Sequence, residues 1–481
     1  MADEGAENKN KSKNVDGRVR VAVIGGGISG LAAASSLVQE RFDVVLLEAS
    51  DYIGGRIKTV KAFPGFPPID LGADFIHGSN SIINKLAEEN NWTVKQSHGI
   101  DNEDPYTITI FLEGKLYSCH DTNQPDIFNA TKAWHEISGL GEKLNQDGDN
   151  ATVENDLGIF KRNLSSWLSS KEVSQNTIDI INSKYCQTNG GTLDIIGVLE
   201  SAYEEACWDY GGENYRFEGS YAVLISHYLQ KCAKVEKRLN WPVKEVKWID
   251  KKKDESVKQT PGVVITSRAG ETLAVDYVVV TVPLTILKDG DIIFSPPLPL
   301  KKQHAINAIQ MGAALKIVCR FGIPFWREKN VIYPIRGFLS QIWTYSRNPK
   351  EDGEECHVGV GFATAALAAQ KAHLSDEEVC EKFLQQLDEI FGTDADPKPA
   401  TNNFMSFVYE HWSRHPYIRG GYSTQTVDTY GLKQHLSAPV EGRLFFAGEA
   451  TSQIVVATVQ SAIETGMRAA REVCEAAGIE C

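Results

Sequence analysis

The feature that most restricts the fold of this chain is a glycine cluster at Gly25, Gly26, Gly27 and Gly30, within "VAVIGGGISGLAAASSL" (21–37). Glycine in quantity costs conformational entropy, so such a cluster indicates a backbone constraint that other residues cannot meet. The preceding residues, "RVRVAVIGG", end in an apolar run typical of a buried parallel strand. The following residues, "LAAASSLVQE", have a helical composition. The sequence therefore predicts a strand, a tight turn and a helix.

The spacing of Gly25, Gly27 and Gly30 is that of the phosphate-binding turn in dinucleotide-binding units. There the first glycine makes the turn, the second admits the backbone close to a pyrophosphate, and the third lets the helix pack on the strand. The amino end of the helix then offers free N–H groups and a positive dipole end to the phosphate. A second predicted strand, "FDVVLLEAS", ends near Glu48, where such units carry the carboxylate that binds ribose hydroxyls. These patterns predict a Rossmann-type α/β unit.

A second glycine element follows at once, in "ASDYIGGRIKT". Gly54 and Gly55 again permit a close backbone approach, and Arg56 brings a fixed charge toward phosphate or flavin. An NAD-dependent dehydrogenase has no need of such an element so soon, whereas flavoproteins that bury the whole dinucleotide often have one. The pair of glycine elements favours FAD over NAD.

Together with Glu48 and "GGRI", the glycine turn resembles the flavin-containing amine oxidases. "IHG" (76–78) is most similar to the animal spermine oxidases and related polyamine oxidases. The resemblance covers most of 19–95, 215–330 and 405–475 and is weak around 100–200 and 345–400.

The resemblance implies an α/β fold with a discontinuous Rossmann-type FAD-binding domain and an α+β substrate-binding domain. The expected limits are a disordered tail at 1–17, an FAD-binding domain at 18–95, 232–300 and 436–481, and a substrate-binding domain at 96–231 and 301–435.

The same resemblance assigns residues to FAD. It places Val243 against the adenine, the Gly448–Glu449 segment at the phosphate and ribityl chain, and the amino end of the last helix at the flavin pyrimidine. The dipole of that helix would stabilise the negative charge of reduced flavin. The expected FAD contacts are Gly25, Gly27, Gly30, Glu48, Gly55, Arg56, Val243, Gly448, Glu449, Thr458 and Val459. No cysteine lies in 449–460, so the flavin is expected to be bound non-covalently.

Three side chains are expected at the reaction centre. Lys316 lies in the apolar stretch "MGAALKIVCRF", where a lysine must be paired, hydrated or functional. In the family, the lysine at this position holds a water near the reactive flavin nitrogen; a structural ion pair is the alternative. His77 titrates near the pH at which an amine must lose its proton, although a surface histidine is also compatible with the sequence. Tyr422, in "WSRHPYIRGGYS", falls where the family places one wall of an aromatic sandwich around the amine; the alternative is a tyrosine that merely packs in the core.

The chain departs from the family pattern in the C-terminal segment. Val455 stands where the second aromatic wall is expected, and Gln460–Ser461 replaces the usual His-Gly pair. The valine is expected to widen the cavity and weaken the amine clamp. Trp208 and Tyr210 could compensate, but the sequence does not place them.

The expected reaction is the FAD-dependent oxidation of an amine C–N bond, as in spermine or spermidine, with O2 reduced to H2O2. Three alternatives stay open: another secondary amine; an amino acid, whose carboxylate would need an arginine such as Arg336 or Arg419; and a catalytically weak flavoprotein with a binding role. A histone demethylase is disfavoured, because the chain lacks the length for an inserted helical hairpin and an extra N-terminal domain.

Composition limits the kinds of molecule that the protein is expected to bind. A net charge of −14 disfavours nucleic acid and is compatible with attraction of a cationic substrate. Neither a secretory signal nor an apolar stretch of spanning length occurs, so we expect no membrane partner and a cytoplasmic location, with the nucleus left open. The nine cysteines include no CxxC pair and are expected to be mostly buried free thiols. No metal-binding pattern occurs, and the sequence does not predict the oligomeric state.

Overall fold

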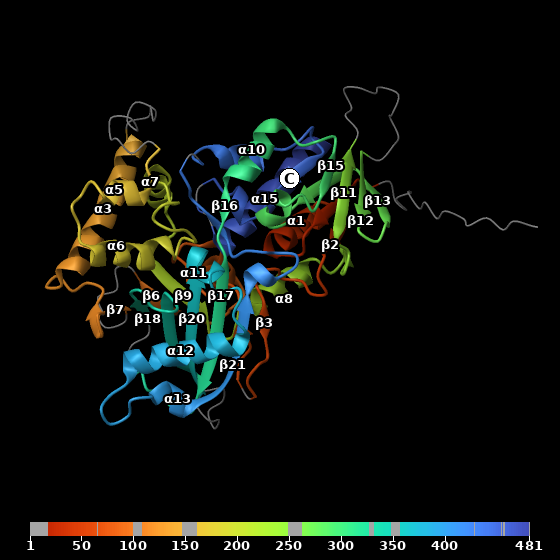
Figure 1. Cartoon of the computed structure of the whole chain (residues 1–481). Coiled ribbons are helices and arrows are strands. Elements are labelled where there is room, and N and C mark those ends of the chain that lie inside the picture. The colour runs from red at the N-terminus through yellow and green to blue at the C-terminus, as the bar shows by residue number, and fades with distance from the viewer. Residues whose placement is uncertain are drawn as a thin grey trace, which may run out of the picture.

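The computed structural model describes residues 18–64, 66–99, 108–146, 161–248, 262–326, 331–347, 356–427, 429–453, 455 and 457–480. The tail expected at 1–17 lies outside these residues. Figure 1 shows two sheet-containing bodies with a helical lobe beside them.

The first body is built on a parallel sheet with the strand order β10-β2-β1-β14-β23. Its strands are β1 (Arg20–Ile24), β2 (Asp43–Leu47), β10 (Glu236–Arg238), β14 (Tyr277–Val280) and β23 (Leu444–Phe446). Successive residues of β1 point to opposite faces and both faces are buried, which explains the continuous apolar run. The sheet joins three distant parts of the chain, so the Rossmann-type domain is discontinuous, as predicted.

Helices cover one face of this sheet. They are α1 (Ile28–Gln39), α2 (Ile82–Glu89), α8 (Ala222–Lys231) and α15 (Val459–Ala477). Helix α1 follows β1 after the glycine turn, which confirms the predicted strand, turn and helix. Helices α1 and α15 pack against each other along the face, and Gly466 of α15 meets the backbone of Ser29.

The other face is covered by a second sheet with the order β13-β12-β11-β15. Its strands are β11 (Val243–Trp248), β12 (Val263–Ser267), β13 (Thr272–Val275) and β15 (Ile293–Ser295). Beside it lie α9 (Leu284–Lys288), α10 (Leu300–Ala308) and α14 (Leu432–Ser437).

The second body is a seven-stranded mixed sheet with the order β21-β17-β20-β19-β18-β7-β8. Its strands are β7 (Ile108–Leu112), β8 (Lys115–Ser118), β17 (Ala314–Phe321), β18 (Val331–Pro334), β19 (Gln341–Arg347), β20 (Cys356–Thr364) and β21 (Phe404–His411). Helix α12 (Asp376–Phe391) crosses one face, as Figure 1 shows. It begins with a capping box between Ser375 and Glu378, a local signal for a helix start. Near it lie α11 (Ala365–Ala369) and α13 (Pro399–Asn403).

The helical lobe packs beside β7 around its own buried cluster. It contains α3 (Pro125–Gln146), α5 (Leu164–Leu168), α6 (Gln175–Ile181), a π-helical turn (Asn182–Cys186) and α7 (Val198–Cys207). The low sequence signal around 100–200 thus corresponds to this lobe.

Short strands connect the bodies. One small sheet has the order β5-β9-β6, from β5 (Ile76–His77), β6 (Val94–Gly99) and β9 (Glu213–Phe217). Two others pair β3 (Thr59–Val60) with β4 (Ile69–Asp70), and β16 (Gln310–Met311) with β22 (Ser423–Thr424). Short 3-10 turns cover Trp412–Arg414 and Glu449–Thr451.

The predicted domain limits stay a prediction. The packing of α8 on α1 favours a middle segment that begins before 232, because Leu224, Ile225 and Tyr228 belong to the buried cluster of the first body.

The cysteines follow the expectation with one exception. Free thiols are present at Cys119, Cys186, Cys207, Cys232, Cys319, Cys356 and Cys380, and all but Cys207 are buried. Cys474 of α15 is disulfide-bonded, so the expectation of free thiols does not extend to it.

Candidate functional site

The glycines of the turn differ in how closely other atoms surround them. At Gly25 and Gly30 a side chain would clash with the protein, whereas at Gly27 it would not. A Cβ atom on Gly30 would lie 2.0 Å from the carbonyl oxygen of Gly25, and one on Gly25 would lie 2.6 Å from Oγ1 of Thr281. A Cβ atom on Gly27 would meet nothing within 4 Å. Gly27 precedes the first residue of α1, so the open space lies where the helix dipole favours an anion. This geometry fits the pyrophosphate of a dinucleotide.

The second glycine element lies directly against the first. The N–H of Gly54 donates to the carbonyl oxygen of Gly26 at 2.9 Å, and a Cβ atom on Gly55 would lie 3.2 Å from Cα of Gly27. Because these backbones touch, the two motifs that the sequence singled out separately form one site.

Glu48 lies just after β2, beside the turn. Its carboxylate accepts from the N–H of Gly26 at 2.5 Å and from the N–H of Ser50 at 2.8 Å, and the residue is buried. This position is compatible with the predicted ribose contact. Val243, at the start of β11, has its side chain in the buried cluster of the second sheet, and its predicted contact with adenine stays a prediction.

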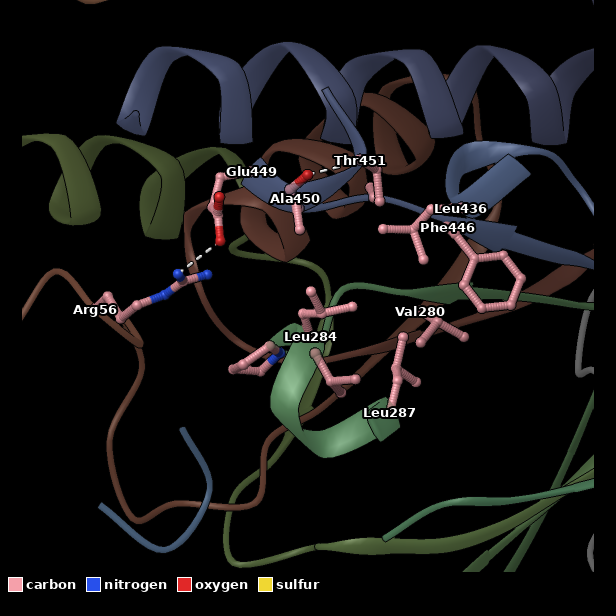
Figure 2. Close-up of a pocket in the computed structure, with 13 residues that line it drawn as sticks. Arg56, Val280, Leu284, Leu287, Leu436, Phe446, Glu449, Ala450 and Thr451 are labelled. Atoms are coloured by element: carbon pink, nitrogen blue, oxygen red, sulfur yellow. Dashed lines mark hydrogen bonds and ion pairs between the residues drawn. The ribbon is translucent and has the colours of Figure 1, made fainter. Parts of the chain in front are cut away.

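A small pocket opens at the carboxyl ends of β14 and β23. Ligands of open α/β sheets bind at this end of the strands. Figure 2 shows the lining, with Arg56 reaching toward Glu449 on one side and Phe446 and Leu436 on the other. Gly448 also lines it. Four predicted cofactor residues therefore gather around this pocket and the adjoining turn: Gly27, Arg56, Gly448 and Glu449.

The charge of Arg56 is partly committed to the protein. Its Nη1 donates to Oε1 of Glu449 at 2.9 Å and to the carbonyl oxygen of Gly421 at 2.8 Å. Ser423 Oγ donates to the same carboxylate at 2.6 Å. Burial acts to raise the pKa of Glu449, but Arg56 and Ser423 outweigh it and hold that pKa below its usual value. Arg56 therefore joins the glycine elements to the segment that carries Tyr422.

The amino end of α15 carries an unsatisfied acceptor. Thr458 caps the helix through a hydrogen bond from the N–H of Ser461 at 3.2 Å, and Val459 is the first helical residue. Gln460 is fully buried, and its Nε2 donates to the carbonyl oxygen of His77 at 2.9 Å. Its Oε1 is buried and makes no hydrogen bond within the described chain. A flavin ring, which carries an N–H donor in its pyrimidine, fits such a position.

The imidazole of His77 is held in one orientation by a residue of the neighbouring strand. Its Nδ1 lies 2.6 Å from Oδ1 of Asn214, which faces it across β5 and β9. Since an amide oxygen only accepts, Nδ1 carries the proton and Nε2 is left as an acceptor. Burial lowers the pKa of His77, against the opposing effect of Asn214, and the imidazole is neutral at neutral pH. Asn214 escaped the sequence prediction, since no local pattern links it to His77.

Lys316 has its three N–H donors directed at protein atoms. Nζ lies 2.8 Å from the carbonyl oxygen of Asp70, 3.1 Å from that of Gly72 and 2.8 Å from Oδ2 of Asp74. Lys316 is 1% exposed. The ion pair weighed as the alternative is therefore present, and the predicted role in holding a water requires one of these hydrogen bonds to be released.

In the described structure Tyr422 is hydrogen-bonded to the protein and Val455 is buried. The Tyr422 hydroxyl donates to the carbonyl oxygen of Thr188 at 2.6 Å, and its ring lies beside Gly190. Val455 is 1% exposed. The side chain of Val455 is therefore buried, and the wider cavity expected at this position stays a prediction.

Trp208, one of the two aromatic residues that the sequence named but did not place, lies next to His77. The Trp208 ring meets the His77 ring edge-on at 6.5 Å between centroids, and the Tyr210 ring lies 5.6 Å from Trp208. The Tyr210 hydroxyl donates to Oε2 of Glu464 in α15 at 2.8 Å. The loop after α7 is thereby anchored beside the amino end of α15.

The described residues contain neither a candidate membrane span nor a candidate metal site. No helix there combines the length and the apolar composition that a membrane crossing needs. No group of three or more His, Cys, Asp or Glu side chains in the described part could hold a metal ion.

The comparisons with known proteins agree with this geometry. A family model described as flavin containing amine oxidoreductase matches residues 28–474. Polyamine oxidase 3 of Oryza sativa subsp. japonica is 29% identical over 462 residues, which are 94% of this chain and 88% of that protein. The flavin-containing amine oxidase B of Cavia porcellus is 26% identical over 490 residues, 95% of this chain and 86% of that protein.

Solved structures show the same fold. Cyclohexylamine oxidase from Brevibacterium oxydans IH-35A superposes with a TM-score of 0.78 at 20% identity, covering 96% of this chain and 100% of that one. Putrescine oxidase bound to putrescine gives a TM-score of 0.76 at 18% identity, covering 95% and 99%.

Proposed function

The chain belongs to the family of flavin-containing amine oxidoreductases and is an FAD-dependent amine oxidase, and from this premise we propose that its substrate is a polyamine such as spermine or spermidine. The product imine is hydrolysed to an aminoaldehyde and an amine. When bound, without a covalent link, FAD would supply the two-electron oxidation of the amine C–N bond and the reduction of O2 to H2O2. Gly27, Arg56, Gly448 and Glu449 are the residues proposed to hold it.

The observation that carries this proposal is the neutral His77 beside the amino end of α15. A polyamine is cationic in solution, and the reacting nitrogen must lose a proton before oxidation. A base must lie within hydrogen-bond reach of that proton and be unprotonated at the working pH. With Nδ1 held by Asn214, Nε2 of His77 meets the second condition.

Trp208 is proposed as the aromatic side chain that faces the amine. It lies edge-on to His77, so an amine bound to Nε2 of His77 comes within reach of the indole. An ammonium over an indole face is stabilised by about 0.5–2 kcal/mol. Trp208 would thus supply the second aromatic wall, which the sequence lacks at Val455. Tyr422 stays proposed as the wall on the other side of the amine.

The acidic surface supports a cationic substrate. A net charge of −14 raises the local concentration of polycations and speeds their encounter with the protein. The relatives named polyamine oxidases agree with this substrate class.

The amino-acid alternative is disfavoured by the state of its arginines. Arg336 pairs with Asp179, and Arg419 pairs with Asp289 and Asp291. Each would have to leave a carboxylate of the protein to bind that of a substrate.

The experiment is a substrate panel on the purified holoenzyme. Oxidised-flavin absorbance should bleach anaerobically with spermine or spermidine, and peroxide should appear in air. Bleaching by monoamines or amino acids alone would replace the polyamine assignment. Absence of bleaching by any amine would favour the binding role. We propose a cytoplasmic location, which fractionation of cells tests directly.

A further inference from the structure

Among the described residues, Lys316 has one ion-pair partner, Asp74, which it shares with a second cation. Asp74 receives Lys316 Nζ on Oδ2 at 2.8 Å, and Arg216 donates to the same carboxylate through Nε at 3.0 Å and Nη2 at 2.5 Å. The indole N–H of Trp343 donates to Oδ2 as well, at 3.2 Å. The Asp74 carboxylate is therefore fully committed and held from three elements.

Because Lys316 is buried, its charge depends strongly on the Asp74 carboxylate. Removal from water lowers the pKa of the lysine, and the Arg216 charge lowers it further. Asp74 is the main group that acts in the opposite direction, with a smaller effect from Asp70. The carbonyl oxygens of Asp70 and Gly72 orient the ammonium but carry no charge.

The other charged groups near Lys316 have partners of their own. The Asp70 carboxyl accepts from Oγ1 of Thr59 and from the N–H of Tyr221. Burial raises the pKa of Asp70 to about 7, and its ionisation above that pH favours the charged lysine, so it does not oppose the effect of Asp74.

Glu410 stands opposite Lys316 on β21, and its carboxylate pairs with Lys58 at 2.5 Å. Arg216 lies over the rings of Phe75 and Tyr345. Asp74 is thus the one carboxylate in direct contact with Lys316 in the described structure.

We propose that Asp74 is a positioning residue for Lys316: bridged to Arg216, its carboxylate fixes the buried ammonium in place and in its charged form. The inference rests on the proposed role of Lys316 toward the flavin. According to this proposal, Asp74, which was not among the predicted site residues, determines how the role of Lys316 depends on pH.

The expected result of Asp74→Asn follows from the loss of the opposing charge. The pKa of Lys316 falls, so the lysine becomes neutral at a pH where it is still charged in the unmodified enzyme. The flavin reoxidation rate should then decline by about tenfold or more between about pH 6 and about pH 9. In the unmodified enzyme the rate should change little over that range, and Asp74→Glu should restore the flat profile.

The measurement uses holoenzyme whose flavin has been reduced by light, mixed rapidly with oxygenated buffer. The reduction potential of the bound flavin at each pH is a second readout that needs neither amine nor oxygen. It should fall with rising pH more steeply in Asp74→Asn than in the unmodified protein, because a positive charge that favours the reduced flavin is lost. If no amine is oxidised, the proposed function fails while this test still gives an answer.

Two variants decide whether the effect passes through Lys316. In a Lys316→Met background, Asp74→Asn should cause no further pH dependence. Glu410→Gln removes a carboxylate from the neighbouring strand and should leave the profile unchanged. A pH profile of Asp74→Asn that matches the unmodified enzyme, or an effect that persists without Lys316, would overturn the proposal. Should Asp74→Asn fail to fold, Asp74→Asn with Arg216→Gln removes the stranded cation and carries the same expectation.

Discussion

At the scale of single residues, each side chain proposed for the chemistry is held from distant parts of the chain. Lys316 is bound by the segment 70–74, and His77 by Asn214 and Gln460. The Tyr422 hydroxyl is bound by Thr188. Such contacts fix donors and acceptors before a ligand arrives, which is the condition under which electrostatic effects on a reaction are large.

Replacing Lys316 should affect the oxygen reaction and spare cofactor binding. Lys316→Met is expected to slow flavin reoxidation by about tenfold or more, because a positioned charge is lost from the reduced flavin's surroundings. Stopped-flow absorbance after anaerobic reduction measures the rate, and the flavin-to-protein ratio checks the binding. Lys371→Met is the matched control, since Lys371 is also buried but bonds only to the carbonyl oxygen of Leu367 in the described structure. An unchanged rate in Lys316→Met would remove the proposed role.

Replacing His77 should remove a base. In the unmodified enzyme, kcat/KM should fall as the pH drops through the pKa of His77, which burial holds below its usual value. His77→Asn is expected to lower kcat/KM for spermine by about 10²-fold and to abolish that part of the pH profile. His227→Asn is the control, because His227 lies against Trp92, away from this site. If kcat/KM of His77→Asn still falls at low pH as in the unmodified enzyme, that fall is due to protonation of the substrate and not of His77.

Replacing Trp208 should weaken amine binding without changing flavin binding. Loss of the indole face in Trp208→Leu is expected to raise KM for spermine about five- to tenfold, the equivalent of roughly 1 kcal/mol. Trp92→Leu, an indole that packs on Phe217, serves as the control. Equal KM values in Trp208→Leu and the unmodified enzyme would show that Trp208 does not contact the amine.

At the scale of elements, the glycine turn offers a test that separates folding from cofactor binding. Gly30→Ala places a Cβ atom 2.0 Å from the carbonyl oxygen of Gly25, so the turn itself must move. Gly27→Ala meets no protein atom, and its extended backbone suits alanine. We expect Gly30→Ala to lower the free energy of unfolding by about 2 kcal/mol or more, and Gly27→Ala to change it by less than about 1 kcal/mol.

FAD affinity should follow the opposite pattern in these variants. Because the open space at Gly27 is where the pyrophosphate is proposed to lie, Gly27→Ala should weaken FAD binding to the apoprotein by about tenfold or more. Denaturation curves and fluorescence titration with FAD measure the two effects. Unweakened FAD binding by Gly27→Ala would place the pyrophosphate elsewhere.

The elements show why sequence reasoning found some of the site and missed the rest. The glycine turn, Glu48 and the amino end of α15 are local patterns, in which spacing along the chain fixes spacing in the structure. The contact of His77 with Asn214 spans 137 residues, and that of Lys316 with Asp74 spans 242. No period or spacing records such contacts. Trp208 lies in the helical lobe, where the resemblance was weak, so its place beside His77 required the fold.

At the scale of the whole molecule, the two bodies meet through the residues that build the site. Arg56 and Lys58 of the first body bond to Gly421 and Glu410, which belong to the second body by the predicted limits. Lys316 of β17 reaches the carbonyl oxygen of Asp70 in β4. Stability of the assembled protein and charge at the site are therefore linked.

Asp70 gives this link a pH dependence. Burial, and then repulsion from Asp74, raise the pKa of Asp70 to about 7, against the smaller effects of Lys316 and of hydrogen bonds from Tyr221 and Thr59. The folded protein thus holds the Asp70 proton more tightly than the unfolded chain, where an aspartate titrates near 3.9. The stability from this group is fully present below about pH 4 and is lost as the pH rises to about 7, by up to about 4 kcal/mol.

Asp70→Asn should therefore gain stability relative to the unmodified protein as the pH rises from about 4 to about 7, because the variant has no proton to lose. Asp74, four residues along, should show the opposite sign. Burial acts to raise the pKa of Asp74, but Arg216 and Lys316 outweigh it and hold that pKa below its usual value. Its contribution is present above about pH 4 and is lost as the pH falls, so Asp74→Asn should be most destabilising at neutral pH. Urea denaturation of both variants and of the unmodified protein at about pH 3, about pH 5 and about pH 7.5 measures the two slopes: that of Asp70 between about pH 5 and about pH 7.5, and that of Asp74 between about pH 3 and about pH 5. Parallel slopes would contradict the assignment of opposite charge states to these two carboxyls.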